Sequence, residues 1–520
     1  MEKNDLFDFE LNEAEGCWSV TGYYGKDEEV IFPASHEGKP VKTIGDRFSP
    51  NNKRIKRVTI PEAYTSIGDS AFEDCTELTK INLPEGLTSI GDSAFKNCTG
   101  LTSIKLPESL ASIGKRVFSD CKGLKEIKLP ESLTSIEDFA FSDCAGLTEI
   151  MLPKSLTSIG EMAFYDCAGL TEFKFPESLT SIGEYTFWKC TGLTEIKLPQ
   201  GLTSLGKMAF GDCTGLTEIK LPQGLTSIGE RSFDDCTGLT KIIFSESLTS
   251  IGDSAFQRCT GLTEINLPES LTSIEGWAFY KCIGLTKIKL PKGLTSFDFI
   301  TVFPDCTELA EISVDENNPV FYAVDGVMFD KAMTTLMWFP AGKKGKYSVP
   351  DGIISIRQGA FDNCKLTGIT FPQSLIFIDT YGFNSDQLTD ITVNELNPNF
   401  YSIDGVLFDK RNSALMEYPK NKDKTDYAVP DGILHIADIA FSRCKRLVNI
   451  VLPEGIRLIL KNAFAECEGL TAVTLPMGLH YIGERAFKDC PNLETVTLSR
   501  KTRIGHKAFE GFKGRFVYRD

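Results

Sequence analysis

Residues 190–212 read CTGLTEIKLPQGLTSLGKMAFGD, and residues 213–235 repeat the pattern as CTGLTEIKLPQGLTSIGERSFDD. A cysteine, a Leu-Pro pair and an Ala-Phe or Ser-Phe pair thus return at a spacing of 23 residues, most regularly between residues 65 and 306. Repeats of this length are typical of solenoids, in which each coil packs only against its neighbours. We therefore expect one growing core rather than the several globular domains that 520 residues would otherwise suggest.

One repeat divides into three parts. LTEIKLP (193–199) alternates apolar and polar residues, which predicts a short strand; stacked copies would form a parallel sheet with strands about 4.8 Å apart. After a Pro-Gly turn, LTSLG predicts a second short strand on the convex side, and KMAFGDC predicts a tight turn or short helix. The side chains expected to face the interior are Leu193, Ile196, Leu198, Leu202, Leu205, Ala209, Phe210 and Cys213.

The 16 cysteines do not read as a disulfide framework. Those from Cys75 to Cys282 recur every 23 residues and would form one column, in which each thiol has two equivalent neighbours and no defined partner. Equivalent positions carry Asp386 and Phe512, so the site tolerates loss of the thiol. We interpret the column as buried, reduced thiols that act as small hydrophobic side chains. Zinc binding is not indicated, because CxxC pairs are absent and the chain has only four histidines.

Composition excludes several classes of partner. The net charge is −16, from 71 acidic and 55 basic residues, which disfavours nucleic acid and anionic membrane surfaces. The sequence lacks an apolar run of about 18 residues, so membrane insertion is not expected. The N-terminal residues lack the basic head and apolar centre of a signal peptide, and a wall anchor is not evident either. The localisation therefore stays open at this point.

Two longer segments interrupt the repeat, at 318–340 and 397–419, in register at an offset of 79 residues. Each contains Asp-Gly between alternating apolar residues, a strong signal for a β-hairpin. We expect these hairpins to project from the stack as insertions. The expected organisation is an N-terminal β-rich cap (1–40), a repeat array (41–314), a hairpin insertion (315–352), further repeats (353–393), a second hairpin insertion (394–432), and final repeats with a C-terminal cap (433–520).

The pattern CxxLxxIxLPxxLxxIGxxAFxx resembles the BspA-like, treponemal-type class of leucine-rich repeat, and the resemblance covers about residues 41–512. The two DGVxFD segments also resemble units found in that family. The resemblance implies a leucine-rich repeat solenoid. It also implies a microbial surface or secreted protein that adheres to host matrix proteins, host cells or other microbes.

Catalysis is not indicated. An enzyme needs a singular constellation of residues, whereas this sequence repeats nearly everything, and its histidines (His36, His435, His480, His506) are scattered. GxSxG, HExxH, a Gly-rich phosphate loop and EF-hand spacing are all missing. We therefore expect no catalytic residues, no metal and no cofactor.

The residues that flank the central isoleucine of the first strand predict a charged face. Stacking would place a column of glutamates beside a column of lysines, whose opposite charges compensate at close range. The face is either a solvated surface that maintains solubility and register, or a polar binding surface for a protein ligand. Its residues are Glu126, Lys128, Glu149, Glu172, Lys174, Glu195, Lys197, Glu218 and Lys220.

A second column is apolar at positions that are polar in most repeats. Four successive repeats place an apolar residue two positions before the buried phenylalanine, and aromatic residues also follow that phenylalanine. The column is either an exposed contact ridge or is partly buried against the adjacent turn. We call it the ridge; its residues are Phe139, Met162, Tyr165, Tyr185, Trp188, Met208 and Trp277.

These observations predict a non-enzymatic, monomeric scaffold that binds a protein ligand, in keeping with an adhesin-like protein at a microbial surface or in secretion. One alternative is an intracellular or effector-like interaction scaffold, which the free thiols and the missing export signal favour. Another is a carbohydrate-binding surface protein that uses the aromatic residues of the ridge.

Overall fold

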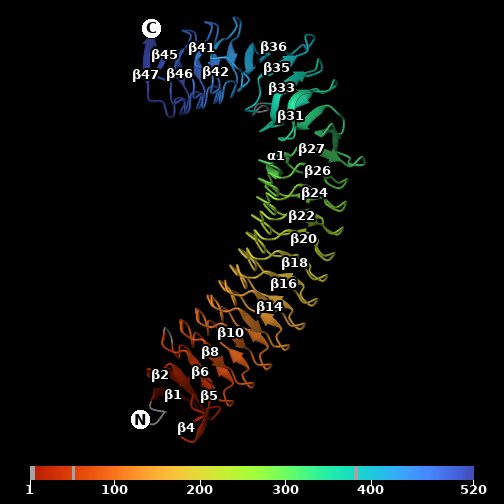
Figure 1. Ribbon diagram of the computed structural model, residues 1–520. Helices are drawn as coiled ribbons and strands as arrows, with labels where there is room; N and C mark the ends of the chain where they lie inside the picture. The colour runs from red at the N-terminus through yellow and green to blue at the C-terminus, as the bar shows by residue number, and fades with distance from the viewer. Residues whose placement is uncertain (1–5, 50–52, 380–384, 520) are drawn as a thin grey trace. The chain divides into compact units, whose positions relative to one another are not determined.

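A computed structural model describes residues 6–49, 53–379 and 385–519. Residues 1–5 of the expected N-terminal cap, residues 380–384 of the expected second repeat segment, and Asp520 lie outside the described residues. The chain forms two compact units. Unit 1 comprises 1–285 with 293–306, and unit 2 comprises 286–292 with 307–520. Each unit is a solenoid of short, mostly parallel strands, which confirms the expected fold class (Figure 1).

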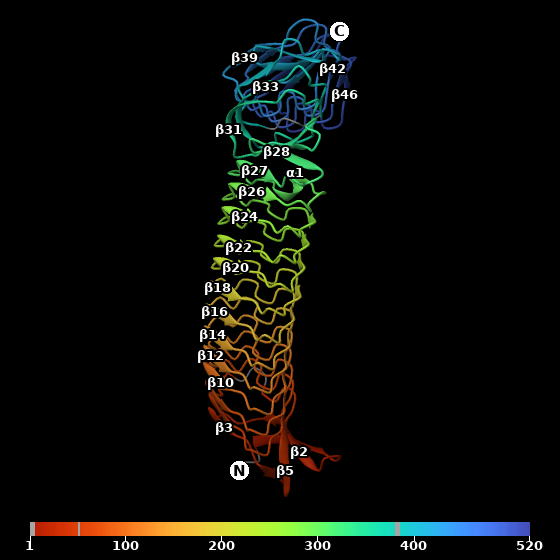
Figure 2. The same ribbon diagram turned by 90° about the vertical axis from the view of Figure 1, so that its right-hand side faces the viewer.

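In unit 1, the first strands of the repeats follow one another in three consecutive parallel sheets, which we together call the main sheet (Figure 2). The central residue points into the core and its two neighbours point outward, as the alternation predicts. Equivalent positions pair across successive repeats, for example Ile196 with Ile219. Its strands are β3 (Glu29–Ile31), β6 (Arg57–Thr59), β8 (Lys80–Asn82), β10 (Ser103–Lys105), β12 (Glu126–Lys128), β14 (Glu149–Met151), β16 (Glu172–Lys174), β18 (Glu195–Lys197), β20 (Glu218–Lys220), β22 (Lys241–Ile243) and β24 (Glu264–Asn266).

The LTSIG segments form a second set of parallel ladders. Their isoleucines are buried, while threonine and serine face outward. Threonine hydroxyls add lateral bonds between repeats: Thr157 Oγ1 donates to the carbonyl of Thr134 at 3.1 Å. These short strands are β7 (Ser66–Ile67), β9 (Ser89–Ile90), β11 (Ser112–Ile113), β13 (Ser135–Ile136), β15 (Ser158–Ile159), β17 (Ser181–Ile182), β19 (Ser204–Leu205), β21 (Ser227–Ile228), β23 (Ser250–Ile251) and β25 (Ser273–Ile274).

The third part of each repeat is a chain of turns; among the described residues the one helix is α1 (Phe299–Val302). Met208 and Asp212 have φ values of 51° and 56°, in the left-handed region, and equivalent positions behave alike. This conformation directs backbone N–H groups at the next coil: Met208 N donates to Glu230 O at 3.0 Å, and Asp212 N to Asp234 O at 2.7 Å. The turns therefore form a hydrogen-bonded ladder of their own.

Buried phenylalanines stack along the axis of unit 1. From Phe72 to Phe279, rings in successive repeats lie 5.3–5.6 Å apart between centroids, with planes within 12° of parallel. Each ring is fully buried. We call this column the phenylalanine ladder. The spacing lies within the range that favours aromatic pairs.

The cysteine column lies beside the phenylalanine ladder. All sixteen cysteines are buried, which confirms their predicted place in the core, and they are free in this structure. Each thiol of the regular array contacts a backbone carbonyl of the preceding coil; Cys190 Sγ donates to Phe164 O at 3.1 Å. Burial raises the pKa of the Cys121 thiol to about 12. The column is thus both packing and a lateral hydrogen-bonding element.

The N-terminal segment begins with an antiparallel pair, β1 (Phe7–Asn12) and β2 (Cys17–Tyr23). Strand β5 (Lys39–Ile44) crosses the boundary expected at residue 40, pairs antiparallel with β4 (Ser35–His36), and joins β2 to β7 in parallel. Strand β3 pairs with β6 and so starts the main sheet inside the expected cap. Capping and repeat structure therefore overlap in this segment.

The two hairpin segments of unit 2 do not project from the stack, contrary to expectation. In the first, β28 (Phe321–Val324), β29 (Val327–Asp330) and β30 (Thr335–Trp338) form an antiparallel meander. Its last strand pairs in parallel with the short strand β32 (Ser355–Ile356). Val327 and Phe329 are fully buried and share a core with Ile356. The second segment repeats this arrangement with β36, β37, β38 and β40. Apolar residues on both sides of the Asp-Gly turn explain the difference, because only an integrated hairpin buries them.

The remaining strands of unit 2 continue the two kinds of ladder, and β47 pairs in parallel with β45 while its side chains stay exposed. The strands of unit 2 are β26 (Lys287–Leu290), β27 (Glu311–Val314), β28 (Phe321–Val324), β29 (Val327–Asp330), β30 (Thr335–Trp338), β31 (Lys344–Ser348), β32 (Ser355–Ile356), β33 (Lys365–Phe371), β34 (Phe377–Ile378), β35 (Asp390–Val393), β36 (Phe400–Ile403), β37 (Val406–Asp409), β38 (Ala414–Glu417), β39 (Asp426–Ala428), β40 (His435–Ile436), β41 (Asn449–Val451), β42 (Leu458–Ile459), β43 (Ala472–Thr474), β44 (Tyr481–Ile482), β45 (Thr495–Ser499), β46 (Arg503–Ile504) and β47 (Arg515–Arg519).

Interrupting the phenylalanine ladder should destabilise the protein strongly. Phe187 stacks between Phe164 and Phe210, so Phe187→Ala leaves a cavity lined by both rings. We expect a loss of about 3–5 kcal/mol in the free energy of unfolding, measured by chemical denaturation. Lys197→Ala, on the exposed face of the next repeat, should change it by less than about 0.5 kcal/mol. Equal effects of the two changes would contradict the ladder's structural role.

The thiol column should be chemically inert while the protein is folded. Burial both blocks access and disfavours the thiolate, which is the reactive form. We expect iodoacetamide to label the cysteines from Cys75 to Cys282 only after unfolding, as judged by mass spectrometry of peptides. Rapid labelling of several of these thiols in the native protein would show that the column faces solvent.

Candidate functional site

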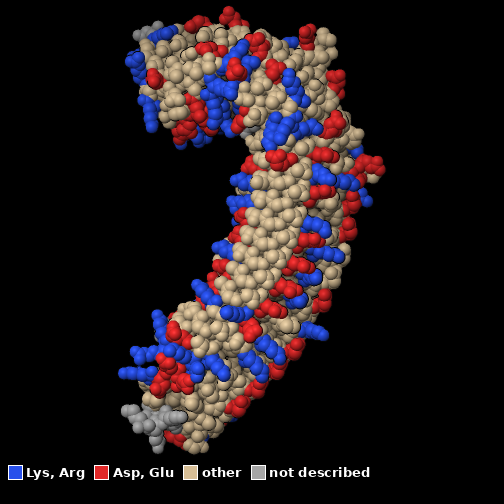
Figure 3. All heavy atoms as spheres, viewed as in Figure 1, with Lys and Arg blue, Asp and Glu red and all other residues tan. Residues whose placement is uncertain are grey.

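The main-sheet face of unit 1 assembles the predicted charged residues. All nine are exposed, and the structure brings equivalent ones side by side: Glu172 pairs in register with Glu195, and Glu195 with Glu218. The lysine column lies beside them, with Lys174 next to Lys197. Figure 3 shows the acidic and basic side chains of unit 1 in rows, next to a band without charged side chains.

Neighbouring charges on this face form surface ion pairs. Lys174 lies 3.0 Å from Glu172, and Lys197 lies 3.3 Å from Glu195. The hydrogen bond and charge of Glu172 raise the pKa of Lys174. Exposed pairs of this kind contribute at most about 1 kcal/mol and are screened by salt, so they can exchange readily for pairs with a ligand.

Three hollows follow one another along this face and share lining residues. The first, of about 440 Å³, extends from Ser103 to Met151. The second, of about 480 Å³, extends from Glu149 to Ser178, and the third, of about 900 Å³, extends from Lys174 to Lys220. The face therefore carries a row of shallow depressions with charged rims.

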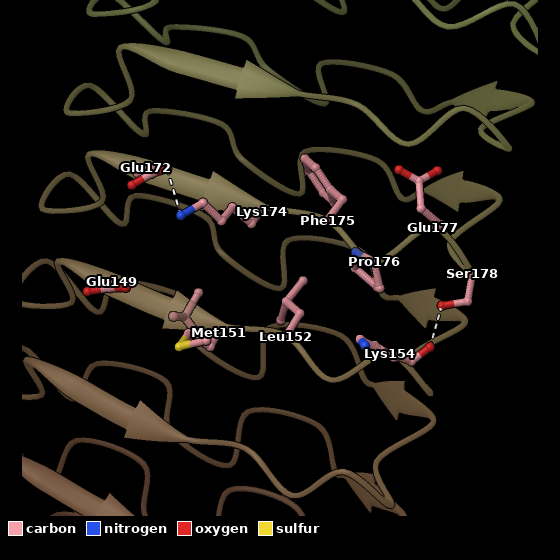
Figure 4. Close-up of a pocket in the computed structure, with 11 residues that line it drawn as sticks. Glu149, Met151, Leu152, Lys154, Glu172, Lys174, Phe175, Pro176, Glu177 and Ser178 are labelled. Atoms are coloured by element: carbon pink, nitrogen blue, oxygen red, sulfur yellow. Dashed lines mark hydrogen bonds and ion pairs between the residues drawn. The ribbon is translucent and has the colours of Figure 1, made fainter.

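The second hollow contains residues that the sequence analysis did not select. Met151 stands where most neighbouring repeats have the lysine of the column, and it is 74% exposed. Phe175 stands before Pro176, at the position where the next repeat has the buried Leu198. Figure 4 shows both side chains in the pocket, Met151 from β14 and Phe175 just beyond β16. The signal was present in the sequence as two departures from the repeat on consecutive coils.

The ridge residues lie on the turns rather than in the core. Phe139, Met162, Tyr165, Tyr185, Trp188 and Met208 are half-buried, and Trp277 is 51% exposed. Trp188 packs against Tyr165 and Tyr185, with ring centroids 5.0 and 6.0 Å away. Cations cover part of the ridge: the Arg116 guanidinium lies 4.4 Å from the Phe139 ring, and Lys189 lies 4.5 Å from Trp188. The ridge is thus partly apolar and partly covered.

The short strands present a third surface, which the sequence analysis did not consider. Between Thr134 and Ser250, their outward side chains are only threonine and serine, and most are exposed. Because the threonine hydroxyls donate to carbonyls of the previous coil, this surface is already hydrogen-bonded within the protein. It offers neither charge nor large apolar groups to a partner.

Across residues 6–49, 53–379 and 385–519, groups of three or more His, Cys, Asp or Glu side chains that could hold a metal ion do not occur. Within the same residues, none of the helices has the length and apolar character needed to cross a bilayer.

One carboxyl group near the ridge is buried. The pKa of Asp234 is raised to about 6, chiefly by burial and then by the charge of Asp235. Gln257 Nε2 donates to Asp234 Oδ1 at 3.1 Å. Asp235 forms an ion pair with Arg258, whose Nη1 lies 2.7 Å from Asp235 Oδ2. The buried Asp234 carboxyl group therefore has an amide as its hydrogen-bond donor, whereas its half-buried neighbour Asp235 has a cation beside it.

Comparison with known families identifies the repeat. The BspA type leucine-rich repeat region matches residues 42–168, 134–259, 226–329, 343–425 and 418–517. Together these segments span most of the chain. A search of curated proteins finds no match.

Solved structures with similar folds are bacterial leucine-rich repeat proteins. A T. pallidum leucine-rich repeat protein is 29% identical over 41% of this chain and 89% of its own, with a TM-score of 0.32. A Bacteroides ovatus leucine-rich repeat protein is 20% identical over 99% of both chains, with a TM-score of 0.35. A leucine rich cell surface protein from Faecalibacterium prausnitzii is 20% identical over 99% of this chain and 94% of its own, with a TM-score of 0.31.

Replacing the buried carboxyl group should stabilise the protein at neutral pH. A folded-state pKa above the ordinary 3.8 means that native protein holds this proton more tightly than unfolded protein. The contribution of this protonated group to the free energy of unfolding is therefore fully present below pH 4 and is lost as the pH rises through about 6. We expect Asp234→Asn to raise the free energy of unfolding by about 1–3 kcal/mol at pH 7 and by much less at pH 4. The matched change Asp235→Asn should not stabilise at pH 7; a pH-independent effect of Asp234→Asn would contradict this interpretation.

Proposed function

Because the chain belongs to the BspA type leucine-rich repeat family, we propose that it is a non-enzymatic scaffold that binds a protein ligand through the main-sheet face of unit 1. Repeat proteins of this kind present an extended surface that suits macromolecular partners. The observation that carries the proposal is the row of hollows from Ser103 to Lys220, rimmed by the glutamate and lysine columns.

The charged columns suit recognition better than tight, permanent association. Rim charges direct encounter and fix register, whereas apolar contacts in the hollows supply affinity. The ordered lysine column also breaks at Met151 and at Ile243, so the face varies along its length. Such variation is what a selective binding surface requires.

We place the protein, as an adhesin-like molecule, at a microbial surface or in secretion, where its ligands would be host or other-cell proteins. This part of the proposal rests on the resemblance of the repeat to surface-associated family members. The free thiols do not argue against it, because their burial protects them in either compartment. An intracellular or effector-like scaffold would use the same face with a different partner.

A second candidate is carbohydrate binding at the ridge, which the cluster of Tyr165, Tyr185 and Trp188 favours. Aromatic rings are apolar surfaces that sugar rings can stack on. Gly211 allows Trp188 to lie close to the next coil, since a Cβ there would be 2.9 Å from the indole. Partial covering by Lys189 makes this the weaker of the two candidates.

Site-specific photo-crosslinking tests which face binds. The crosslinking amino acid p-benzoylphenylalanine would replace Lys197 on the main sheet, Met208 on the ridge, or Thr203 on the short strands. Each full-length variant would be illuminated with intact microbial and host cells and with purified matrix proteins. We expect discrete adducts from position 197 and none from position 203, which is the matched control on the same coil.

Other adduct patterns would overturn the proposal. Adducts only from position 208 would assign binding to the ridge, and equal adducts from all three positions would indicate non-specific contact. A complete lack of adducts from position 197 would argue against the main-sheet face.

A further inference from the structure

The hollow around Met151 and Phe175 differs from the rest of the main-sheet face. On the flanking coils the outward residue after the central apolar residue is a lysine, Lys128 or Lys174, but here it is an exposed methionine. On the next coil, Phe175 is half-buried where Leu129 and Leu198 are buried. Two consecutive departures thus build an apolar floor of Met151, Leu152, Phe175 and Pro176 in a charged surface.

The strands beside this hollow are also less tightly paired than their neighbours. Between β14 and β16 only Met151 and Lys174 remain in ladder register, whereas adjacent strand pairs keep three. The backbone bond from Thr171 N to Thr148 O lengthens to 3.5 Å. Phe173, in place of isoleucine, explains this looser strand pairing. Its ring lies between neighbouring coils, with centroid distances of 4.6 Å to Phe187 and 5.1 Å to Phe164.

Two opposite charges flank the apolar floor and remain available. Among the described residues, Glu149 and Lys154 make no ion pair, whereas Lys174 is held by Glu172 and Glu177 accepts the backbone N–H of Gln200. Figure 4 shows Glu149 at one end of the pocket and Lys154 at the other, with Met151 and Leu152 between them. On the coil that carries β14, the pocket is therefore lined by an acidic residue, two apolar residues and a basic residue in that order, while the next coil adds Glu172, Lys174 and Glu177.

We propose that this pocket holds an extended segment of the protein ligand, in which a large apolar side chain is flanked by a basic residue on one side and an acidic residue on the other. The apolar side chain fills the floor, the basic residue pairs with Glu149, and the acidic residue pairs with Lys154. In an extended segment, side chains on one face recur every second residue, about 7 Å apart. The charges are therefore expected two residues before and two after the apolar position.

The pocket geometry favours a protein segment over a small ligand. A volume of about 480 Å³ accommodates one large side chain and its neighbours, and the pocket is continuous with the other two hollows of the face. The proposal rests on the proposed function, since it names the ligand feature that the main-sheet face selects.

Peptide selection on the full-length chain tests the proposal. A phage library of random dodecapeptides would be selected in parallel on the unaltered chain and on Met151→Lys, Glu149→Lys and Ile243→Lys. Met151→Lys and Ile243→Lys both restore the lysine of the column, but only the first lies in the pocket. Met151 and Glu149 are exposed, so neither change should disturb folding, which circular dichroism would verify.

We expect peptides with an apolar residue between opposite charges, with affinity about tenfold weaker for Met151→Lys and unchanged for Ile243→Lys. On Glu149→Lys, the selected peptides should carry acidic residues on both sides. If the double change Glu195→Lys with Glu218→Lys weakens peptide binding but Met151→Lys does not, the pocket is overturned and the main-sheet proposal stands. Peptides insensitive to every main-sheet change would overturn both, and a failure to enrich any peptide would overturn the pocket as a peptide site.

Discussion

The structure depends on equivalent positions of successive repeats lying directly against one another. The phenylalanine ladder, the cysteine column and two sets of strand ladders all express this one constraint, since a single repeat has too few inward side chains to bury a core alone. Each coil completes its neighbour's hydrophobic contacts and hydrogen bonds. Interior residues therefore vary less along the array than surface residues do, with departures such as Phe173 in place of isoleucine.

The turns show that stacking also overrides local preference. Residues as different as Ser93, Arg116 and Trp277 adopt the same left-handed backbone conformation, which costs non-glycine residues on the order of 1 kcal/mol or more. Lateral bonds such as that from Met208 N to Glu230 O offset this cost. The same positions supply Phe139, Met162, Tyr185, Met208 and Trp277 of the ridge, so the backbone ladder sets the direction of these side chains.

The proposed function rests on the contrast between a regular core and a more variable surface. The glutamate and lysine columns repeat because the repeat does, and they give the main-sheet face its general character. In the proposed pocket, selectivity comes from a departure from the repeat, which joins Met151, Phe173 and Phe175 on consecutive coils. There, a bulky ring placed in the core opens the sheet and exposes an apolar floor between unpaired charges.

The sequence by itself determined the solenoid, the inward positions such as Ile196 and Phe210, and the charged columns, because a fixed period and apolar alternation leave few other ways to bury these side chains. Tertiary structure alone decided the features that depend on neighbouring coils. Val327 and Phe329 had to pack into the core, so the hairpins are integrated rather than projecting. The half-burial of the ridge, the pocket at Met151 and the raised pKa of Asp234 arise from contacts between residues about one repeat apart, which no single repeat encodes.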